Sequence, residues 1–488
     1  MSFEKRRDLS GQIYRQIRAA ILDGRLRPGD SVPPSRELAQ RLEVSRNTVS
    51  VAYDRLTAEG FVTGRVGAGT YVSKSVSEPD GPAVVGNGAG PRGRGGHRRP
   101  VPVDGPLRPR EIWTEVRPPR ALETEPEFDF RVGIPDARMF PYETWRRLTV
   151  GQLRASVVQT GMYGHPAGHR ELRTAIARHV GVARAVTATA DDIIVTNGTQ
   201  QALDLIGRVM LEPGRCVAVE EPGYEPPRRL FESLGARVVG VPVDAEGMVV
   251  DALPDDACLV YVTPSHQFPL GMPMSLARRM ALLRWAQRRG AAIVEDDYDS
   301  EFRFAGRPIE PLHTLDRNGL VSYVGSFSKV MLPILRMGFV VAPPSLRGPL
   351  GAAKYLTDWH TAVPTQIALA RFISEGALSR HIRRMRNEYR ARHERITAVL
   401  TRDFADWLTP IPSLAGLHLS AVFRDGCPVD AAELKAAVLR DGVAVDALAT
   451  FAPPGRAPNG LVLGYGAIAT EQIEDGLCRL RRCLLALR

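Results

Sequence analysis

Apolar side chains recur at helical spacing along the first sixty residues. Three helices are expected from them, around residues 10–22, over SRELAQRL (35–42) and over SRNTVSVAYDRLTAEG (45–60). Ser35 and Ser45 stand where a hydroxyl can cap the second and third helices, and Gly60 is expected to end the third. The positions expected to face inward are Ile13, Ile17, Ala20, Ile21, Leu38, Leu42, Val49, Ala52, Tyr53 and Leu56.

Two short strands around a glycine-rich tip are expected next, in FVTGRVGAGTYVS (61–73). Two short helices followed by such a hairpin are typical of a winged helix-turn-helix, an α+β fold whose second helix enters the DNA major groove. Arg46 has the fork that reads guanine, and Asn47 and Thr48 suit a base edge or a phosphate. The expected DNA contacts are Ser45, Arg46, Asn47, Thr48 and, in the wing, Arg65. The alternative is a small helical oligomerisation module with a solvated basic face.

From about residue 125 the pattern changes to apolar runs separated by amphipathic helices. Such runs, flanked by helices, indicate a mostly parallel sheet that is covered on both faces, and so an α/β fold. The expected strands are IIVT (193–196), VAVE (217–220), LVYVT (259–263), AAIVED (291–296), VSYVGS (321–326) and GFVVA (338–342).

The segment between these two zones is rich in Gly, Pro and Arg and has almost no large apolar side chain. Such a segment cannot bury enough surface to offset the entropy of ordering it. We expect a DNA-reading domain over residues 1–75, a flexible basic linker over 76–124 and a second, larger domain over 125–488.

Charge and cysteine content agree with a DNA-bound protein of the cytoplasm. The 488 residues carry a formal net charge of +10, which suits a polyanionic partner. Five scattered cysteines offer neither a disulfide framework nor metal-ligand spacing, so no metal site is expected. No signal peptide or membrane span is recognisable, and we expect a cytoplasmic protein.

The second domain carries residues that suit a phosphorylated aldehyde cofactor. Such a cofactor needs a lysine for a Schiff base, an anion cradle for its phosphate and an acid beside its pyridine nitrogen. GSFSK (325–329) supplies Lys329 after an apolar strand, with Ser326 and Ser328 as phosphate donors. Arg336, seven residues on, can pair with the same phosphate.

Two further segments complete this set. In IIVTNGTQQALDLI, a strand passes through a small-residue loop into a helix, so the amides of Gly198, Thr199 and Gln200 would face an anion. AAIVEDDYDSEF places Asp296 or Asp297 at the end of a strand, followed by Tyr298 for the phenolic oxygen. Tyr224, in EEPGY, can stack on the ring. Each segment alone fits a surface loop, a turn or a solvated strand end; their ordered combination favours the cofactor.

The sequence resembles a known family of regulators at both ends. Residues 10–73, with the phrase PPSRELAQRLEVSRNTVSVAYDRLTAEG, resemble the GntR-family winged helix, in which Arg36 and Arg46 are the expected phosphate or base contacts. Residues from about 128 to 488 resemble a fold-type I aminotransferase, in the version found in MocR/GabR-type regulators. The phrases that carry this are YGHPAGHRELR, TNGTQQALDL, EEPGY, VEDDYDSEFRF and YVGSFSKVMLPILRMGF.

The resemblance implies pyridoxal phosphate as the cofactor. It implies a Schiff base on Lys329, Asp296 at the pyridine nitrogen and Tyr298 at the ring hydroxyl. Ser326, Ser328 and Arg336 would bind the phosphate, helped by Tyr163 from a partner subunit. It also implies a head-to-tail homodimer in which each DNA reader packs against the other chain's large domain.

Three positions depart from the pattern of catalytic relatives. QFPLG has Phe268 where those enzymes carry an asparagine that bonds the ring hydroxyl; His266 is a candidate to compensate. LVLGYG has Val462 where an arginine holds the substrate carboxylate, and His165 replaces an acid in YGHPAG. We therefore expect a transcription regulator that senses an amine, an amino-acid-like effector or pyridoxal phosphate itself, with weak or absent transamination and no catalytic residues of its own. The alternatives are an active aminotransferase with an appended DNA-binding module and a DNA-binding protein with a vestigial, cofactor-free core.

Overall fold

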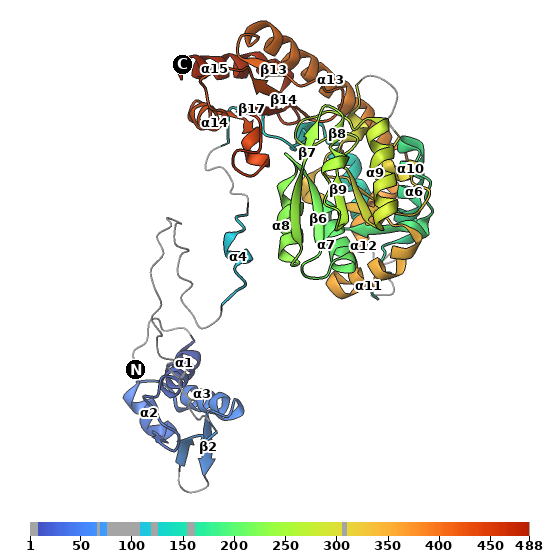
Figure 1. Ribbon diagram of the computed structural model, residues 1–488. Coiled ribbons are helices and arrows are strands. Elements are labelled where there is room, and N and C mark those ends of the chain that lie inside the picture. The colour runs from blue at the N-terminus through green and yellow to red at the C-terminus, as the bar shows by residue number, and fades with distance from the viewer. Residues whose placement is uncertain are drawn as a thin grey trace, which may run out of the picture. The chain divides into compact units, whose positions relative to one another are not determined.

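The computed structural model in Figure 1 describes residues 8–65, 69–75, 108–118, 125–153, 162–304 and 310–487. By its internal contacts the chain divides into two units, Met1–Arg99 and Pro100–Arg488. In the part of the chain described, no helix is long and apolar enough to cross a membrane.

The first unit has the expected three helices and a hairpin. Strand β3 is the centre of an antiparallel sheet of order β1-β3-β2. The helical apolar stripes meet in one core, in which Ile13, Val49 and Leu56 are fully shielded from solvent, whereas Leu42 is only half-buried. The elements are α1 (Leu9–Leu22), β1 (Ser31–Val32), α2 (Ser35–Arg41), α3 (Arg46–Ala58), β2 (Val62–Arg65) and β3 (Gly69–Val72).

Of the two expected serine caps, the one at Ser45 is present and the one at Ser35 is not. Ser45 caps α3, because its Oγ accepts a hydrogen bond of 3.1 Å from the Thr48 amide. Ser35 does not cap α2: it is the first residue of that helix, and Pro34 holds the cap position without a side-chain bond. The two prolines before Ser35 fix extended backbone up to Pro34, and the helix begins at Ser35, one residue earlier than a cap at Ser35 would predict.

The second unit is built on an eight-stranded sheet of order β5-β12-β11-β10-β9-β6-β7-β8. β6, β7, β9, β10 and β11 run parallel, while β12 is antiparallel to β5 and β11. The six expected strands are all present, and β7 and the edge strand β8 are additional. Their bounds are β5 (Ile193–Thr196), β6 (Cys216–Glu221), β7 (Arg237–Asp244), β8 (Gly247–Met248), β9 (Ala257–Val262), β10 (Ala292–Asp297), β11 (Val321–Ser326) and β12 (Gly338–Val341).

Helices surround this sheet (Figure 1), and every residue of β5, β6, β9, β11 and β12 is buried, as expected of strands covered on both faces, whereas most of β7 is partly exposed. The helices are α5 (Tyr142–Gly151), α6 (Arg170–Arg184), α7 (Thr199–Met210), α8 (Glu225–Ser233), α9 (Leu276–Arg289), α10 (Leu312–Leu315), α11 (Arg347–Asp358) and α12 (Val363–Ser374).

A smaller subdomain follows, with a four-stranded sheet of order β13-β14-β17-β16. The 27-residue helix α13 leads into it. The first strand of the unit, β4 (Phe128–Asp129), joins this end of the molecule by pairing with β15 (Val443–Ala444). The remaining elements are α13 (Ala377–Asp403), β13 (Leu408–Pro410), β14 (His418–Phe423), α14 (Ala431–Arg440), β16 (Asp446–Ala447), β17 (Gly460–Gly464) and α15 (Ile473–Ala486).

Most of the linker expected over 76–124 lies outside the described residues. The part that is described, 108–118, contains the short helix α4 (Ile112–Glu115). Arg110 donates a 2.9 Å hydrogen bond to the carbonyl of Ser233 at the end of α8, so this stretch contacts α8 within the second unit.

Candidate functional site

A cavity of about 190 Å³ lies in the second unit at the carboxyl ends of β10 and β11. Ligand sites in open α/β sheets are found at this end of the strands. Nine of the eleven residues expected to bind the cofactor line it: Thr199, Gln200, Tyr224, Asp296, Tyr298, Ser326, Ser328, Lys329 and Arg336. Gly198 lies directly behind Arg336, and Tyr163 is not among the lining residues.

Asp296 is the acid of this cavity. One carboxylate oxygen accepts a 2.8 Å bond from the Tyr261 hydroxyl, whereas the other is shielded from solvent and has no partner among the described residues. Burial raises the pKa of Asp296 to about 7. Asp297 does not line the cavity: one of its oxygens pairs with Arg184 at 2.8 Å and accepts a 2.6 Å bond from Tyr323, and the other is buried without a hydrogen-bond partner among the described residues. Of the two acids left open by the sequence, only Asp296 is available to a ligand in the cavity.

Lys329 lines the cavity and is half-buried. Its Nζ donates a 2.7 Å hydrogen bond to the carbonyl of Gly133. Burial lowers the pKa of Lys329, which increases the fraction of the neutral, nucleophilic amine. Gly133 has a φ of 78°, and a Cβ there would come within 2.7 Å of the lysine nitrogen. No local sequence pattern points to this glycine, because its segment reaches Lys329 only through the fold.

The anion cradle is assembled from two loops. The N-terminus of α7 brings Thr199 and Gln200 to the cavity, beside Ser326 and Ser328 from the end of β11. Arg336 donates a 3.1 Å bond to the carbonyl of Asn197. At Gly198, with a φ of 80°, a Cβ would lie 2.7 Å from the Arg336 guanidinium, so glycine permits the close approach.

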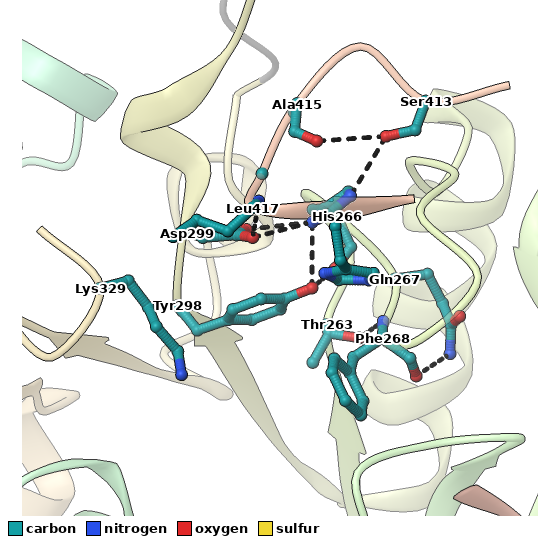
Figure 2. Close-up of polar contacts among 12 residues, drawn as sticks. Thr263, His266, Gln267, Phe268, Tyr298, Asp299, Lys329, Ser413, Ala415 and Leu417 are labelled. Atoms are coloured by element: carbon teal, nitrogen blue, oxygen red, sulfur yellow. Dashed lines mark hydrogen bonds and ion pairs between the residues drawn. The ribbon is translucent and has the colours of Figure 1, made fainter. Parts of the chain in front are cut away.

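Tyr298 makes contacts that the sequence did not predict (Figure 2). Its hydroxyl donates a 2.9 Å bond to the carbonyl of His266 and lies 3.0 Å from Nδ1 of the same ring. That Nδ1 is 3.1 Å from both carboxylate oxygens of the buried Asp299, while Nε2 is 3.2 Å from Ser413. His266, which was expected to compensate for Phe268, therefore orients Tyr298 and is itself oriented by Asp299.

The wall around Phe268 is aromatic. Its ring makes edge-on contacts with Tyr224 and Tyr298, with ring centroids 5.5 and 6.0 Å apart. His418 from β14 stands beside it and donates from Nε2 to the carbonyl of Pro269 at 3.0 Å. Burial lowers the pKa of His418 to about 3, so this ring is neutral. The wall offers no amide to a ring hydroxyl.

Among the described residues, the cavity lining offers no second arginine to a carboxylate. Val462 is fully buried in an apolar cluster with Leu270 and Leu448. Among the described residues that line the cavity, Arg336 is the only arginine. An amino-acid carboxylate thus meets no guanidinium beyond the one in the phosphate cradle.

Tyr163 and His165 lie outside the cavity. Tyr163 is 72% exposed and stacks on Trp359 with ring centroids 4.3 Å apart. Its expected role at a partner subunit's phosphate stays a prediction. His165 accepts a 3.1 Å hydrogen bond at Nδ1 from the Ala167 amide, so it organises its own loop.

The candidate DNA-reading residues are at the start of α3 and α2. Arg46, Asn47 and Arg36 are exposed. The hydroxyls of Ser45 and Thr48 are 2.7 Å apart and so are engaged with each other. Arg65 ends β2, where its backbone pairs with Gly69; its side chain lies outside the described residues.

Comparison with known proteins agrees with both units. Residues 9–72 match the bacterial regulatory proteins of the gntR family, and residues 123–457 match aminotransferase class I and II. The probable rhizopine catabolism regulatory protein MocR of Rhizobium meliloti is 36% identical over 98% of this chain and 94% of its own length. The chain belongs to the MocR-type transcription regulators.

This MocR-type regulator is also similar to a second regulator in sequence and to an aminotransferase in structure. The pyridoxine biosynthesis transcriptional regulator PdxR of Corynebacterium glutamicum is 33% identical over 93% of this chain and 91% of its own. The crystal structure of kynurenine aminotransferase from Pyrococcus horikoshii superimposes with a TM-score of 0.68 at 29% identity, covering 75% of the regulator and 92% of the enzyme. The second unit of the regulator therefore has an aminotransferase fold, joined to a gntR-type winged helix.

Proposed function

We propose that this regulator binds pyridoxal phosphate on Lys329 and uses the loaded domain as a sensor. The observation that carries the proposal is the buried, unpartnered oxygen of Asp296 in the same cavity as Lys329 and Arg336. A buried acceptor without a donor is costly, and the protonated pyridine nitrogen of the cofactor supplies that donor. When bound, the cofactor supplies an aldehyde that reacts reversibly with primary amines and a ring that withdraws electrons.

Each remaining group has a role toward such a cofactor. Asp296 would hold the ring nitrogen, and its negative charge would be stabilised by the positive ring. Tyr224 and Phe268 would bracket the ring, with Tyr298 directed by His266. The residues for the phosphate are Gly198, Thr199, Gln200, Ser326, Ser328 and Arg336.

The same cavity favours sensing over turnover. Transamination needs a carboxylate held so that the breaking bond stands across the ring, and Val462 supplies no cation for it. Phe268 cannot donate to the ring oxygen, which lowers transition-state stabilisation. We therefore propose an amine or amino-acid-like effector, or pyridoxal phosphate itself. The name of the relative PdxR refers to pyridoxine biosynthesis, which favours pyridoxal phosphate itself as the effector.

The output is proposed to be a change in DNA binding by a cytoplasmic, head-to-tail homodimer. Arg36, Arg46 and Asn47 would contact the operator, with Arg65 at the backbone or minor groove. The effector shifts the equilibrium only through its different affinity for the two DNA-binding states. The basic segment over 76–124 would connect the two domains.

Chemical trapping tests the cofactor proposal. Borohydride reduction of the loaded protein followed by peptide mass spectrometry should place a pyridoxyl group on Lys329. Lys329→Ala should lose the visible absorption band while keeping its fold. Lys435→Ala, which removes a lysine in a partly exposed ion pair with Asp446, is the control and should keep the band. A pyridoxyl group on any other lysine contradicts the assignment.

Turnover tests the aminotransferase alternative. The purified protein is mixed with a panel of amino acids, amines and sulfonates while the visible spectrum and keto-acid release are followed. We expect spectral change without sustained keto-acid release. Multiple turnovers with a common amino acid would favour the enzyme, and a protein that takes up no cofactor would favour the vestigial core.

A further inference from the structure

A second hollow of the large unit has no place in the function proposed above. It is a groove of about 1240 Å³ between α6 and α13, with residues of α12 and of the turn Ser300–Phe302 in its floor. Six arginines that form no ion pair among the described residues line it. They are Arg170, Arg178, Arg303, Arg383, Arg386 and Arg390.

The spacing of the arginines on α6 and α13 brings their positive charges together along the groove. Arg383, Arg386 and Arg390 are three and four residues apart on α13, so they share one face of the helix. Arg170 and Arg178 face them from α6. Like charges on neighbouring helices repel each other, so the arrangement costs energy unless an anion fills it.

Three of the arginines are already partly withdrawn from water. Arg303, Arg386 and Arg390 are half-buried, and the Nε of each is shielded from solvent without a hydrogen-bond acceptor among the described residues. Burial lowers the pKa of the Arg303 guanidinium. Desolvated guanidinium groups without acceptors are uncommon, because each loses hydration that nothing replaces.

The acids of the groove do not neutralise this charge. Glu301 is shielded from solvent at one carboxylate oxygen, and burial raises its pKa to about 8, so it is mostly protonated at neutral pH. Glu171 is exposed at the rim. Arg184, which also lines the groove, is the one arginine with an acid partner, Asp297.

We propose that this groove is a second ligand site, separate from the cofactor cavity, for a small anion that carries two or more phosphate groups. Guanidinium groups bind phosphate oxygens in pairs, and two facing rows of them suit a chain of phosphates. A small ligand is favoured over the backbone of duplex DNA, because the half-buried arginines and the apolar Ile373, Ile382 and Phe304 line the inside of a hollow. A duplex about 20 Å wide would reach only its rim.

Calorimetric titration of tripolyphosphate into the cofactor-loaded protein tests the proposal. Loading first fills the phosphate cradle at Arg336, and about 0.15 M salt screens unspecific attraction. We expect one tripolyphosphate per chain, and at least tenfold weaker binding after Arg386→Gln with Arg390→Gln. The matched control is Arg395→Gln with Arg402→Gln, which removes the same charge from α13 at positions that do not line the groove. It should bind as the wild type does.

Three outcomes overturn the proposal: no binding by the wild type, equal weakening in both double variants, or a lower salt dependence of DNA binding only in the groove variant. The last would assign the groove to the DNA backbone. If the groove variant fails to fold, phenylglyoxal labelling of the wild type decides. Tripolyphosphate should protect Arg386 and Arg390 from the reagent and leave Arg402 reactive; equal labelling with and without the anion counts against the site.

Discussion

The cofactor cavity and the start of α3 place their polar side chains in opposite surroundings. In the cavity Asp296 is buried, and burial moves the pKa values of Asp296 and Lys329 toward neutrality. At the start of α3, Arg46 and Asn47 are exposed, and no hydrogen bond or ion pair with another described residue holds their side chains. The cavity is organised before its ligand arrives, whereas the DNA reader relies on its partner to order its side chains.

This contrast predicts which properties of the protein change when each region is mutated. Changes in the cavity should alter stability, pH dependence and cofactor binding together, since the same buried charges contribute to all three. Changes at the start of α3 should alter DNA affinity and leave the stability of the protein unchanged, with the helix cap as the exception.

The largest expected effect is on cofactor retention in Asp296→Asn. A buried charge-assisted hydrogen bond contributes about 3 kcal/mol, so the dissociation constant for pyridoxal phosphate should rise roughly a hundredfold. Spectroscopic titration of the cofactor-free protein measures it. Asp256→Asn, at an exposed acid that pairs with Arg237, is the control. Equal affinity in wild type and Asp296→Asn would remove Asp296 from the site.

The same substitution should have the opposite effect on the cofactor-free protein at high pH. The pKa of Asp296 is about 7 in the folded state against an ordinary 3.8, so folding holds a proton that the unfolded chain releases. Stability from this group is therefore unaffected below pH 4 and is lost as the pH rises from 4 to about 7. Asp296→Asn should be more stable than wild type at pH 8 by about 1–3 kcal/mol and indistinguishable from it at pH 4. Thermal melts at both values test this; a constant difference contradicts it.

The DNA reader should give a smaller, sequence-specific effect. Arg46→Ala should weaken operator binding by about 1–3 kcal/mol and relax discrimination at one position in each half-site. Arg98→Ala, in the basic segment, should change only salt-dependent, sequence-independent affinity. Competition assays against operators mutated at single positions distinguish the two. An Arg46→Ala protein that discriminates as the wild type does would show that this arginine reads no base.

The smallest effect is expected at the cap of α3. Ser45→Ala removes the bond to the Thr48 amide and should destabilise the first unit by about 1 kcal/mol. Ser35→Ala is the matched control, since Ser35 makes no capping bond, and should change stability little. Denaturant melts of both variants compare them directly. Equal losses would show that the cap bond contributes nothing measurable.

The sequence predicted most of the strands because a parallel sheet buries both faces, which leaves continuous apolar runs such as IIVT and VSYVGS. It did not predict the small sheet, whose short strands β13 and β16 carry little pattern. The strand pattern alone could not choose between Asp296 and Asp297, since adjacent residues of a strand point to opposite faces; only the family resemblance indicated Asp296.

The contacts of Tyr298 could not be predicted from the sequence for another reason. Asp299 and Ser413 meet His266 from segments 33 and 147 residues away, so no local pattern connects them. Gly133 reaches Lys329 across 196 residues. Local spacing indicated the residue types that a cofactor needs, but long-range partners of those residues require the assembled sheet.

The pairing of β4 with β15 attaches the first strand described in the large unit to the small subdomain. The backbone of residues 128–130 is hydrogen-bonded to the small subdomain. The Phe128 amide donates to the carbonyl of Gly442, the Phe130 amide donates to the carbonyl of Ala444, and the Gly464 amide donates to the carbonyl of Phe130. Three residues further on, Gly133 accepts the bond from Lys329. Residues 128–133 therefore link the hydrogen bonds of the small subdomain directly to the side chain of Lys329. A change of bonding partner at Lys329 would therefore free a carbonyl only three residues from backbone that is hydrogen-bonded to the small subdomain.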